Sequence, residues 1–223
     1  GNGKTCGGSM SEETTARDGI ARWAKSMFDR GLTNGSSGNI SVRLSDGRLL
    51  VTPTGSSMGF IDPGRMSLID PSGKLLSGDA PTKEIPLHSA FYETRHGAGA
   101  VVHLHSCHSV VLSVLPETDP DDVIPPITAY SVMKLGRVKL LPYFMPGDPA
   151  MGDAVRGLLG KRSAVLLANH GPVVCGKDLD AAVYAMEELE EAAKLTLLCR
   201  GLSPKLLSQA EVSHLVEKFD VSW

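Results

Sequence analysis

The order of apolar and polar residues divides the chain into short segments with two different periods. Residues 12–30 carry apolar side chains at the spacing of one helix face, namely Ile20, Trp23, Ala24, Met27 and Phe28. Residues 39–44 instead alternate between apolar and polar positions, and after the turn signal Asp46-Gly47 the run RLLVTPTG returns as a partner strand. The first part of the chain therefore predicts a helix followed by a hairpin.

The same two periods predict the remaining elements. In chain order we expect a short strand pair between 61 and 81, a helix over 82–96, a buried strand over 99–106, a short helix over 107–116, strand-like runs divided by Gly136 between Ile127 and Phe144, a short helix over 147–160, core strands over 163–168 and 173–176, a long helix from Asp178 to Arg200, and a last helix opened by the capping box of Ser208 and Glu211. This order indicates a single α/β domain over 11–223, with a mostly antiparallel central sheet covered by helices, after a flexible segment 1–10.

Composition narrows the class of protein. The 223 residues are 42% hydrophobic and 21% charged, and the net charge of −3 does not favour binding to nucleic acid or to an anionic membrane. No apolar run reaches the roughly 20 residues of a membrane-spanning helix, and the N-terminal stretch lacks the apolar core of a secretory signal. The four cysteines are scattered, which favours free thiols and a cytoplasmic location.

The segment VVHLHSCHS places three histidines within six residues. If it is a strand, His103 and His105 project from the same face and can share one metal ion, while Leu104 faces the opposite side. His108 falls past the expected strand end, whereas Cys107 would keep the phase of a longer strand. Core or surface histidines without a metal are the ordinary alternative.

His170 is the better candidate for a third ligand, and Cys107 is the alternative. His170 follows the apolar run of LLANHGPV, where a buried strand ends and Gly171-Pro172 impose a turn. Three imidazoles that leave one coordination position open form a catalytic zinc arrangement. Glu84 opens the helix that precedes the histidine strand and would be a proton shuttle beside such an ion, although a glutamate there can also simply favour the helix dipole. His88, one turn later, is expected near the site or in the core.

Two glycine- and hydroxyl-rich loops flank the predicted hairpin, TNGSSGNIS at 33–41 and TPTGSSMG at 52–59. Such loops offer backbone N–H groups that can surround a phosphate, although most are only turns. Thr82 and Lys83 would add a hydroxyl, a helix N-terminus and a positive charge. A rival nucleotide site, Gly3-Lys4-Thr5, lacks the preceding strand and the full spacing of a phosphate-binding loop.

Taken in order, the segments GSSGNISVRL, LLVTPTGSSMG, PTKEIPLHSAFYETR, AVVHLHS and LLANHGPVVCG resemble the class II aldolase/adducin-head family of zinc-dependent sugar-phosphate enzymes, over roughly residues 15–200. The resemblance implies a three-layer fold and one Zn²⁺ per subunit on His103, His105 and His170, with Glu84 as proton donor and acceptor and as an additional ligand when no substrate is bound. It also implies a cyclic homotetramer with sites between subunits, where Tyr130 would reach a neighbour's site. The phosphate-binding residues it implies are Gly38, Asn39, Thr54 and Gly55, assisted by Thr82 and Lys83.

Further segments, including SGDAPTKE and MEELEEAAKL, are most similar to the branch that decarboxylates 3-oxo-tetronate 4-phosphate to dihydroxyacetone phosphate and CO₂ through a metal-stabilised enediolate. The alternative is an aldolase of the L-fuculose-phosphate type, or an epimerase or dehydratase of the same superfamily. Those aldolases carry two serines where this chain has Thr82 and Lys83, and a tyrosine in their C-terminal tail, whereas this chain has none after Tyr184. A non-catalytic adducin-like head would lack the zinc histidines.

Overall fold

The computed structural model describes residues 7–223, with side chains described from Ser11 onward. Its α-helices are α1 (Gly7–Asp29), α2 (Ile85–Thr94), α3 (Cys107–Val114), α4 (Ala129–Leu135), α5 (Ala150–Arg156), α6 (Leu179–Leu198) and α7 (Gln209–Lys218). Its strands are β1 (Asn39–Arg43), β2 (Leu49–Val51), β3 (Ser67–Ile69), β4 (Leu75–Ser77), β5 (Ala100–His103), β6 (Lys139–Leu141), β7 (Ala164–Leu167) and β8 (Gly171–Gly176). Two 3₁₀ turns, Met58–Phe60 and Pro63–Arg65, connect β2 to β3.

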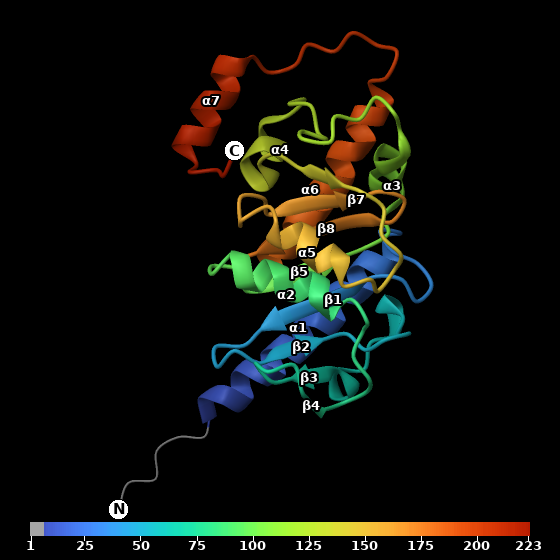
Figure 1. Cartoon of the computed structure of the whole chain (residues 1–223), viewed down its shortest axis with the longest axis vertical. Helices are drawn as coiled ribbons and strands as arrows, with labels where there is room; N and C mark the ends of the chain where they lie inside the picture. Colours follow the sequence, from blue (N-terminus) through green and yellow to red (C-terminus); the bar gives the residue numbers. More distant parts are fainter. Residues whose placement is uncertain (1–6) are drawn as a thin grey trace, which may run out of the picture.

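The strands form one sheet in the order β4-β3-β2-β1-β5-β8-β7-β6. Neighbouring strands run antiparallel except for the parallel pair β6 and β7. Helices α2 and α5 cover one face of this sheet, and α1, α3 and α6 cover the other (Figure 1). This confirms the predicted α/β domain with a mostly antiparallel sheet and three layers.

Alternation along the strands assigns side chains to the two cores. Ile40 and Leu44 of the first hairpin pack with α1 and α6, as does Val102 of β5. Val101 faces the opposite core, under α2 and α5. The side chain of His103 follows the phase of Val101 and therefore lies on the α2 face, which decides where a metal site can form.

The start of α1 lies earlier than the sequence predicts. The helix begins at Gly7 instead of residue 12, inside the segment predicted to be flexible. The first six residues, including Gly3-Lys4-Thr5, lie outside the described residues, so the predictions made for them stay predictions. Within residues 7–223, no helix combines the length and the apolar character needed to cross a membrane.

The strand-like reading of Ile127 to Phe144 is wrong in its first half. Residues 129–135 form α4, whose N-terminus is capped by the Thr128 hydroxyl, which accepts a hydrogen bond from the Ser131 N–H. Its buried residues Ser131, Val132 and Leu135 have helical spacing, a pattern that a short apolar run does not distinguish from a strand. Gly136 ends the helix with a φ of +61°, and only then does the chain enter β6.

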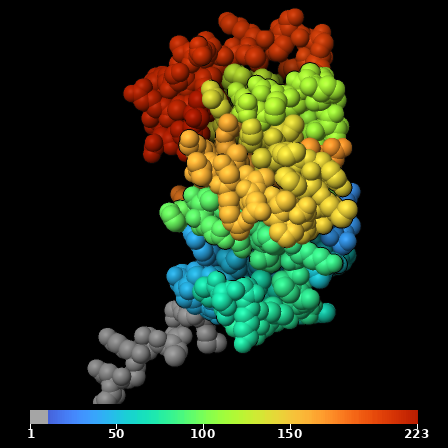
Figure 2. All heavy atoms as spheres, viewed as in Figure 1, coloured from blue at the N-terminus to red at the C-terminus, as the bar shows by residue number. Residues whose placement is uncertain are grey.

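The C-terminal segment folds back onto this region. Helix α7 packs against α4, and a Cβ on Gly136 would lie 2.4 Å from the carbonyl oxygen of Ser222. The capping box predicted at Ser208 and Glu211 is present, with both of its hydrogen bonds. Figure 2 shows this segment in red, covering one end of the molecule.

Candidate metal and catalytic site

His103 is the last residue of β5, and its side chain is fully buried. It pairs with Asn39, the first residue of β1, and with Val173 of β8. Strand β1 thus begins opposite His103, so β5 loses this partner immediately beyond it. The prediction that the strand continues through residue 106 is therefore wrong, and His105 lies in the following loop, exposed to solvent.

Leu104 is buried in the core on the α1 and α6 side, so its side chain and that of His103 still point to opposite faces. The backbone of the β7–β8 turn presses on this segment, since a Cβ on Gly171 would lie 2.2 Å from the Leu104 carbonyl oxygen. The side-chain alternation therefore continues one step beyond the strand end, and it brings the rings of His103 and His105 to a centroid distance of 5.1 Å.

His170 lies in the turn that joins β7 to β8. Asn169, just before it, has a φ of +58°, a left-handed conformation that asparagine adopts more readily than most residues. The Asn169 N–H donates to the Ser113 hydroxyl of α3, which fixes the turn. As a result, His170 points back across the sheet edge toward β5.

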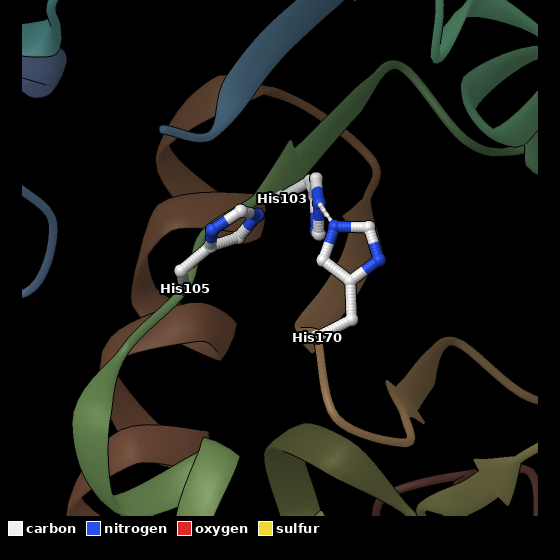
Figure 3. Close-up of side chains that lie close together, drawn as sticks. All are labelled: His103, His105 and His170. Carbon is white, nitrogen blue, oxygen red and sulfur yellow. Dashed lines mark hydrogen bonds between the residues drawn. The ribbon is translucent and has the colours of Figure 1, made fainter. Parts of the chain in front are cut away.

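The three imidazoles face one another, as Figure 3 shows. The ring of His170 has its centroid 4.8 Å from that of His103 and 4.7 Å from that of His105. One ring nitrogen of each residue lies within 4.8 Å of those of the other two. When the histidines, cysteines and carboxylates of the described residues are compared, these three histidines form the group whose ligand atoms have the spacing of a metal site.

Glu84 completes the group from the start of α2. It occupies the N-cap position, but its side chain makes no capping hydrogen bond and turns toward the histidines instead. One carboxylate oxygen lies 3.3 Å from His103 Nε2 and the other 3.3 Å from His170 Nε2. The helix-dipole explanation therefore does not account for the direction of this side chain.

These distances provide a test of whether a metal fits. Ligand atoms that each lie about 2.0–2.1 Å from one tetrahedral zinc ion are about 3.3 Å apart from each other. The observed separations are 3.2 Å between the Nε2 atoms of His103 and His170 and 3.3 Å from each to Glu84. The donor set, imidazoles with a carboxylate, is the one that zinc and similar divalent ions prefer. The residues present therefore fit the ion.

Hydrogen bonding selects the nitrogen that faces the site. His103 Nδ1 lies 2.9 Å from the carbonyl oxygen of Pro172, which can only accept, so Nδ1 carries the proton. Nε2 is thereby left toward His170 and Glu84. Such a carbonyl partner behind a ligand histidine fixes the ring and its tautomer.

The protonation states of the group also suit metal binding. Although the loop residue His105 is exposed, its ring is partly desolvated beside the other two histidines. This desolvation, with smaller contributions from His103 and His170, lowers the pKa of His105 to about 4, so that the ring is neutral near pH 7. Burial alone would raise the pKa of the Glu84 carboxyl. The neighbouring His103 and His170 rings and a hydrogen bond from Asn39 more than offset that effect, and the pKa of Glu84 lies well below its usual range.

The neighbouring candidates lie elsewhere. Cys107, the rival third ligand, is exposed at the first position of α3 and does not belong to the group described above. His108 contacts Glu190 of α6, with its Nδ1 3.0 Å from a carboxylate oxygen. The same carboxylate accepts the N–H groups of His108 and Ser109, and so holds the start of α3 directly after the histidine loop.

Three segments predicted to bind phosphate lie around Glu84. Asn39 donates its side-chain amide to Glu84 at 2.7 Å, and Thr82 Oγ1 lies 3.4 Å from the same amide. The loop at Thr54 joins them, because the Thr54 N–H donates to Ala80 and Pro53 pairs with Pro81. Gly38 has a φ of +82°, and a Cβ there would lie 2.8 Å from the His103 carbonyl oxygen. The structure thus brings most of these predicted residues to one side of the metal group.

The remaining predicted residues are more exposed. Thr54, Gly55 and Lys83 lie on the surface, and Tyr130, at the second position of α4, is 62% exposed. The side chain of Asn39, in contrast, is buried and engaged by Glu84 and by His88. The sequence pattern predicted His88 only near the site or in the core, because its link to Asn39 joins segments far apart in the chain.

Comparison with known proteins identifies the family. The sequence profile of the family described as "Class II Aldolase and Adducin N-terminal domain" matches residues 18–197. The chain belongs to this family. The match spans every strand of the sheet and all four residues of the metal group.

Members of the family with named activities cover most of the chain. The 3-oxo-tetronate 4-phosphate decarboxylase of Escherichia coli strain K12 is 46% identical over 203 residues, which are 91% of this chain and 96% of that protein. The L-fuculose phosphate aldolase of Haemophilus influenzae is 36% identical, over 86% of this chain and 88% of its own length. The crystal structure of YgbL from Escherichia coli superposes with a TM-score of 0.89 at 45% identity, covering 91% of this chain and 98% of that one.

Proposed function

We propose that this protein is a carbon–carbon lyase that decarboxylates 3-oxo-tetronate 4-phosphate to dihydroxyacetone phosphate and CO₂, with a zinc ion bound by His103, His105, His170 and Glu84. The observation that carries the proposal is the convergence of these side chains at ligand spacing. The relative that carries this activity in its name is more similar to the chain than the aldolase relative, over a larger part of it.

The reaction breaks the bond between C1 and C2 of a 3-oxo acid, and the electron pair stays on C2, next to the C3 carbonyl. A divalent ion held by the imidazoles supplies positive charge that stabilises the negative charge developing on oxygen. Glu84, ionised at rest, takes up one proton from solvent and delivers it to C2. The products are CO₂ and dihydroxyacetone phosphate, and one proton is consumed.

The phosphate end of the substrate is assigned to Gly38, Asn39, Thr54, Gly55, Thr82 and Lys83. Backbone N–H groups in glycine loops, together with the start of α2, are the donors that proteins commonly use for phosphate. The proximity of these segments to Glu84 supports the assignment. Lys83 is the cation of the set, and its aliphatic stem lies against Gly147.

We further propose that the protein acts in carbohydrate metabolism in the cytoplasm and forms the homotetramer that the resemblance implies, with each site between two subunits. Tyr130 is assigned to a neighbour's site, and its large exposed fraction is what supports this role. Sedimentation of the purified protein would test the assembly. The Tyr130→Phe variant should lower kcat without changing the sedimentation coefficient.

An aldolase acting on a six-carbon ketose 1-phosphate is the second candidate, because the metal group and Glu84 serve that reaction equally well. The pair Thr82 and Lys83, in place of two serines, favours the decarboxylase. The test measures kcat/KM of the zinc-loaded protein for both substrates. We expect CO₂ and dihydroxyacetone phosphate in equal amounts from the 3-oxo acid, at a value far above that for L-fuculose 1-phosphate. A comparable or higher value for the ketose would establish the aldolase instead.

A further inference from the structure

A chain of buried hydrogen bonds runs from the core to Glu84. His88, one turn after Glu84 on α2, is completely buried. Its Nδ1 lies 2.7 Å from the Ser41 hydroxyl of β1, and its Nε2 makes a short contact with the side-chain oxygen of Asn39. The Tyr92 hydroxyl, one further turn along α2, lies 2.8 Å from the Ser41 hydroxyl.

The protons in this chain have one consistent order. Asn39 presents its amide N–H₂ to the Glu84 carboxylate, with Nδ2 2.7 Å from a carboxylate oxygen. Its oxygen then faces His88, and since an amide oxygen only accepts, His88 carries its proton on Nε2. With Nδ1 unprotonated, the Ser41 hydroxyl donates to it. Tyr92 in turn donates to the hydroxyl and carbonyl oxygens of Ser41.

The opposite orientation of Asn39 is disfavoured by the same logic. It would place the amide oxygen against an ionised carboxylate and the N–H₂ group against the Nε2–H of His88. A buried donor facing a donor leaves both groups unsatisfied, at a cost of about 1–3 kcal/mol for each group. Glu84 and His88 therefore fix the orientation of the Asn39 amide together.

His88 is suited to this task because it is completely buried and its two ring nitrogens face neutral partners, the Ser41 hydroxyl and the Asn39 amide oxygen. A buried ring with such partners is best accommodated in its neutral form. Both of its nitrogens are occupied by protein partners, so neither is available to substrate.

We propose that His88 is a positioning residue: its Nε2–H fixes the amide of Asn39, and Asn39 in turn holds the Glu84 carboxylate against the metal group. This inference rests on the proposed role of Glu84 in proton transfer. Asn39 then has two roles: it positions Glu84, and it is also predicted to bind phosphate. Glu84 thereby keeps a single orientation while it takes up and delivers a proton.

The test compares variants at two positions of this chain, His88 and Tyr92. His88→Leu removes the donor, so Asn39 can rotate, and kcat should fall about 10- to 100-fold because a general acid displaced by about 1 Å loses that much. Bound zinc should stay within about twofold of wild type, since the three imidazole ligands are unchanged. His88→Gln retains an N–H near the position of Nε2 and should recover most of kcat.

Tyr92→Phe is the matched control, since it also removes a buried polar group on α2 but leaves His88 and Asn39 in place. It should lower Tm while leaving kcat within about twofold of wild type. A purely structural role for His88 predicts that kcat follows Tm across all three variants, without recovery in His88→Gln. That pattern would overturn the proposal. Kinetics are measured with whichever of the two substrates the wild type turns over.

A second readout is independent of the reaction. In ¹⁵N-histidine-labelled, zinc-loaded protein, NMR should show His88 as the neutral Nε2–H tautomer from pH 5 to pH 8. A proton on Nδ1, or a charged ring within that range, would disprove the proton order whatever the substrate is. If the wild type does not release CO₂ but His88 is the neutral Nε2–H tautomer, the proposed function is wrong and the proton order in the chain stands.

Discussion

The site has a buried wall and an exposed rim, and they differ in how many of their side chains are held in place by hydrogen bonds within the protein. The wall consists of His103, His170, Asn39 and His88, all buried and each hydrogen-bonded to another protein group. The rim consists of Thr54, Lys83 and Tyr130, all exposed, and within residues 7–223 none of these three side chains has a hydrogen-bond partner.

This difference follows from what each half has to bind. A metal ion needs ligands held within a few tenths of an ångström, so its side chains are oriented before the ion arrives. A phosphate carries negative charge and several acceptor oxygens, so hydroxyls and a lysine that are solvent-exposed in the free protein can bind it without being oriented beforehand. Substitutions in the wall should therefore lower kcat, whereas substitutions of the phosphate-binding rim residues Thr54 and Lys83 should weaken substrate binding.

The largest effect is expected from His103→Ala. It removes an imidazole that lies at ligand distance from both His170 and Glu84, so zinc should be lost and activity should fall below detection. Metal analysis after gel filtration, together with the CO₂ assay, measures both. His108→Ala, which contacts Glu190 instead, is the matched control and should keep its zinc. Equal zinc in the two variants would contradict the assignment of the wall.

Glu84→Gln should separate chemistry from metal binding. The amide cannot deliver a proton, so kcat should fall by roughly 10²–10⁴-fold, the usual contribution of a general acid or base. Three imidazoles remain, so most of the zinc should stay bound. The measurement is kcat with zinc content on the same sample, and unchanged turnover would remove Glu84 from the mechanism.

Lys83→Met probes the rim. A hydrogen bond to a charged group is worth about 1.5–3 kcal/mol, so KM should rise roughly 10- to 100-fold while kcat and zinc content change little. Steady-state kinetics give both parameters, and inorganic phosphate should inhibit the variant less than wild type. A large fall in kcat at unchanged KM would place Lys83 in the wall instead.

The smallest effect is expected from Cys107→Ser. This residue is the rival third ligand from the sequence, but it is exposed and lies outside the histidine group. Zinc content and kcat should both stay within about twofold of wild type, since no ligand is lost. Zinc loss in this variant would mean that the loop rearranges to use the thiol.

Local sequence patterns predicted the parts of the fold that depend on short-range periodicity. The long helix, the first hairpin and the α7 capping box follow from side-chain spacing within each segment. The strand-like prediction failed over residues 129–135 because seven residues with a few apolar positions fit either period. Tertiary contacts with α6 and α7, which no local pattern contains, favour the helix there.

For the site, alternation predicted correctly that the side chains of His103 and His105 lie on one side and Leu104 on the other. Only the strand boundary was wrong, since β5 ends at His103, where its neighbour β1 starts. The link between Asn39 and His88 joins segments 49 residues apart, and only the packing of α2 on β1 reveals it.

X-ray absorption at the zinc edge of the reconstituted protein tests most directly whether imidazoles and a carboxylate surround one ion. The spectrum should fit three imidazole nitrogens at about 2.0–2.1 Å with one or more oxygens at about 2.0–2.2 Å, and no sulfur. A sulfur at about 2.3 Å, or fewer than three imidazoles, would contradict the proposed metal centre and the mechanism built on it.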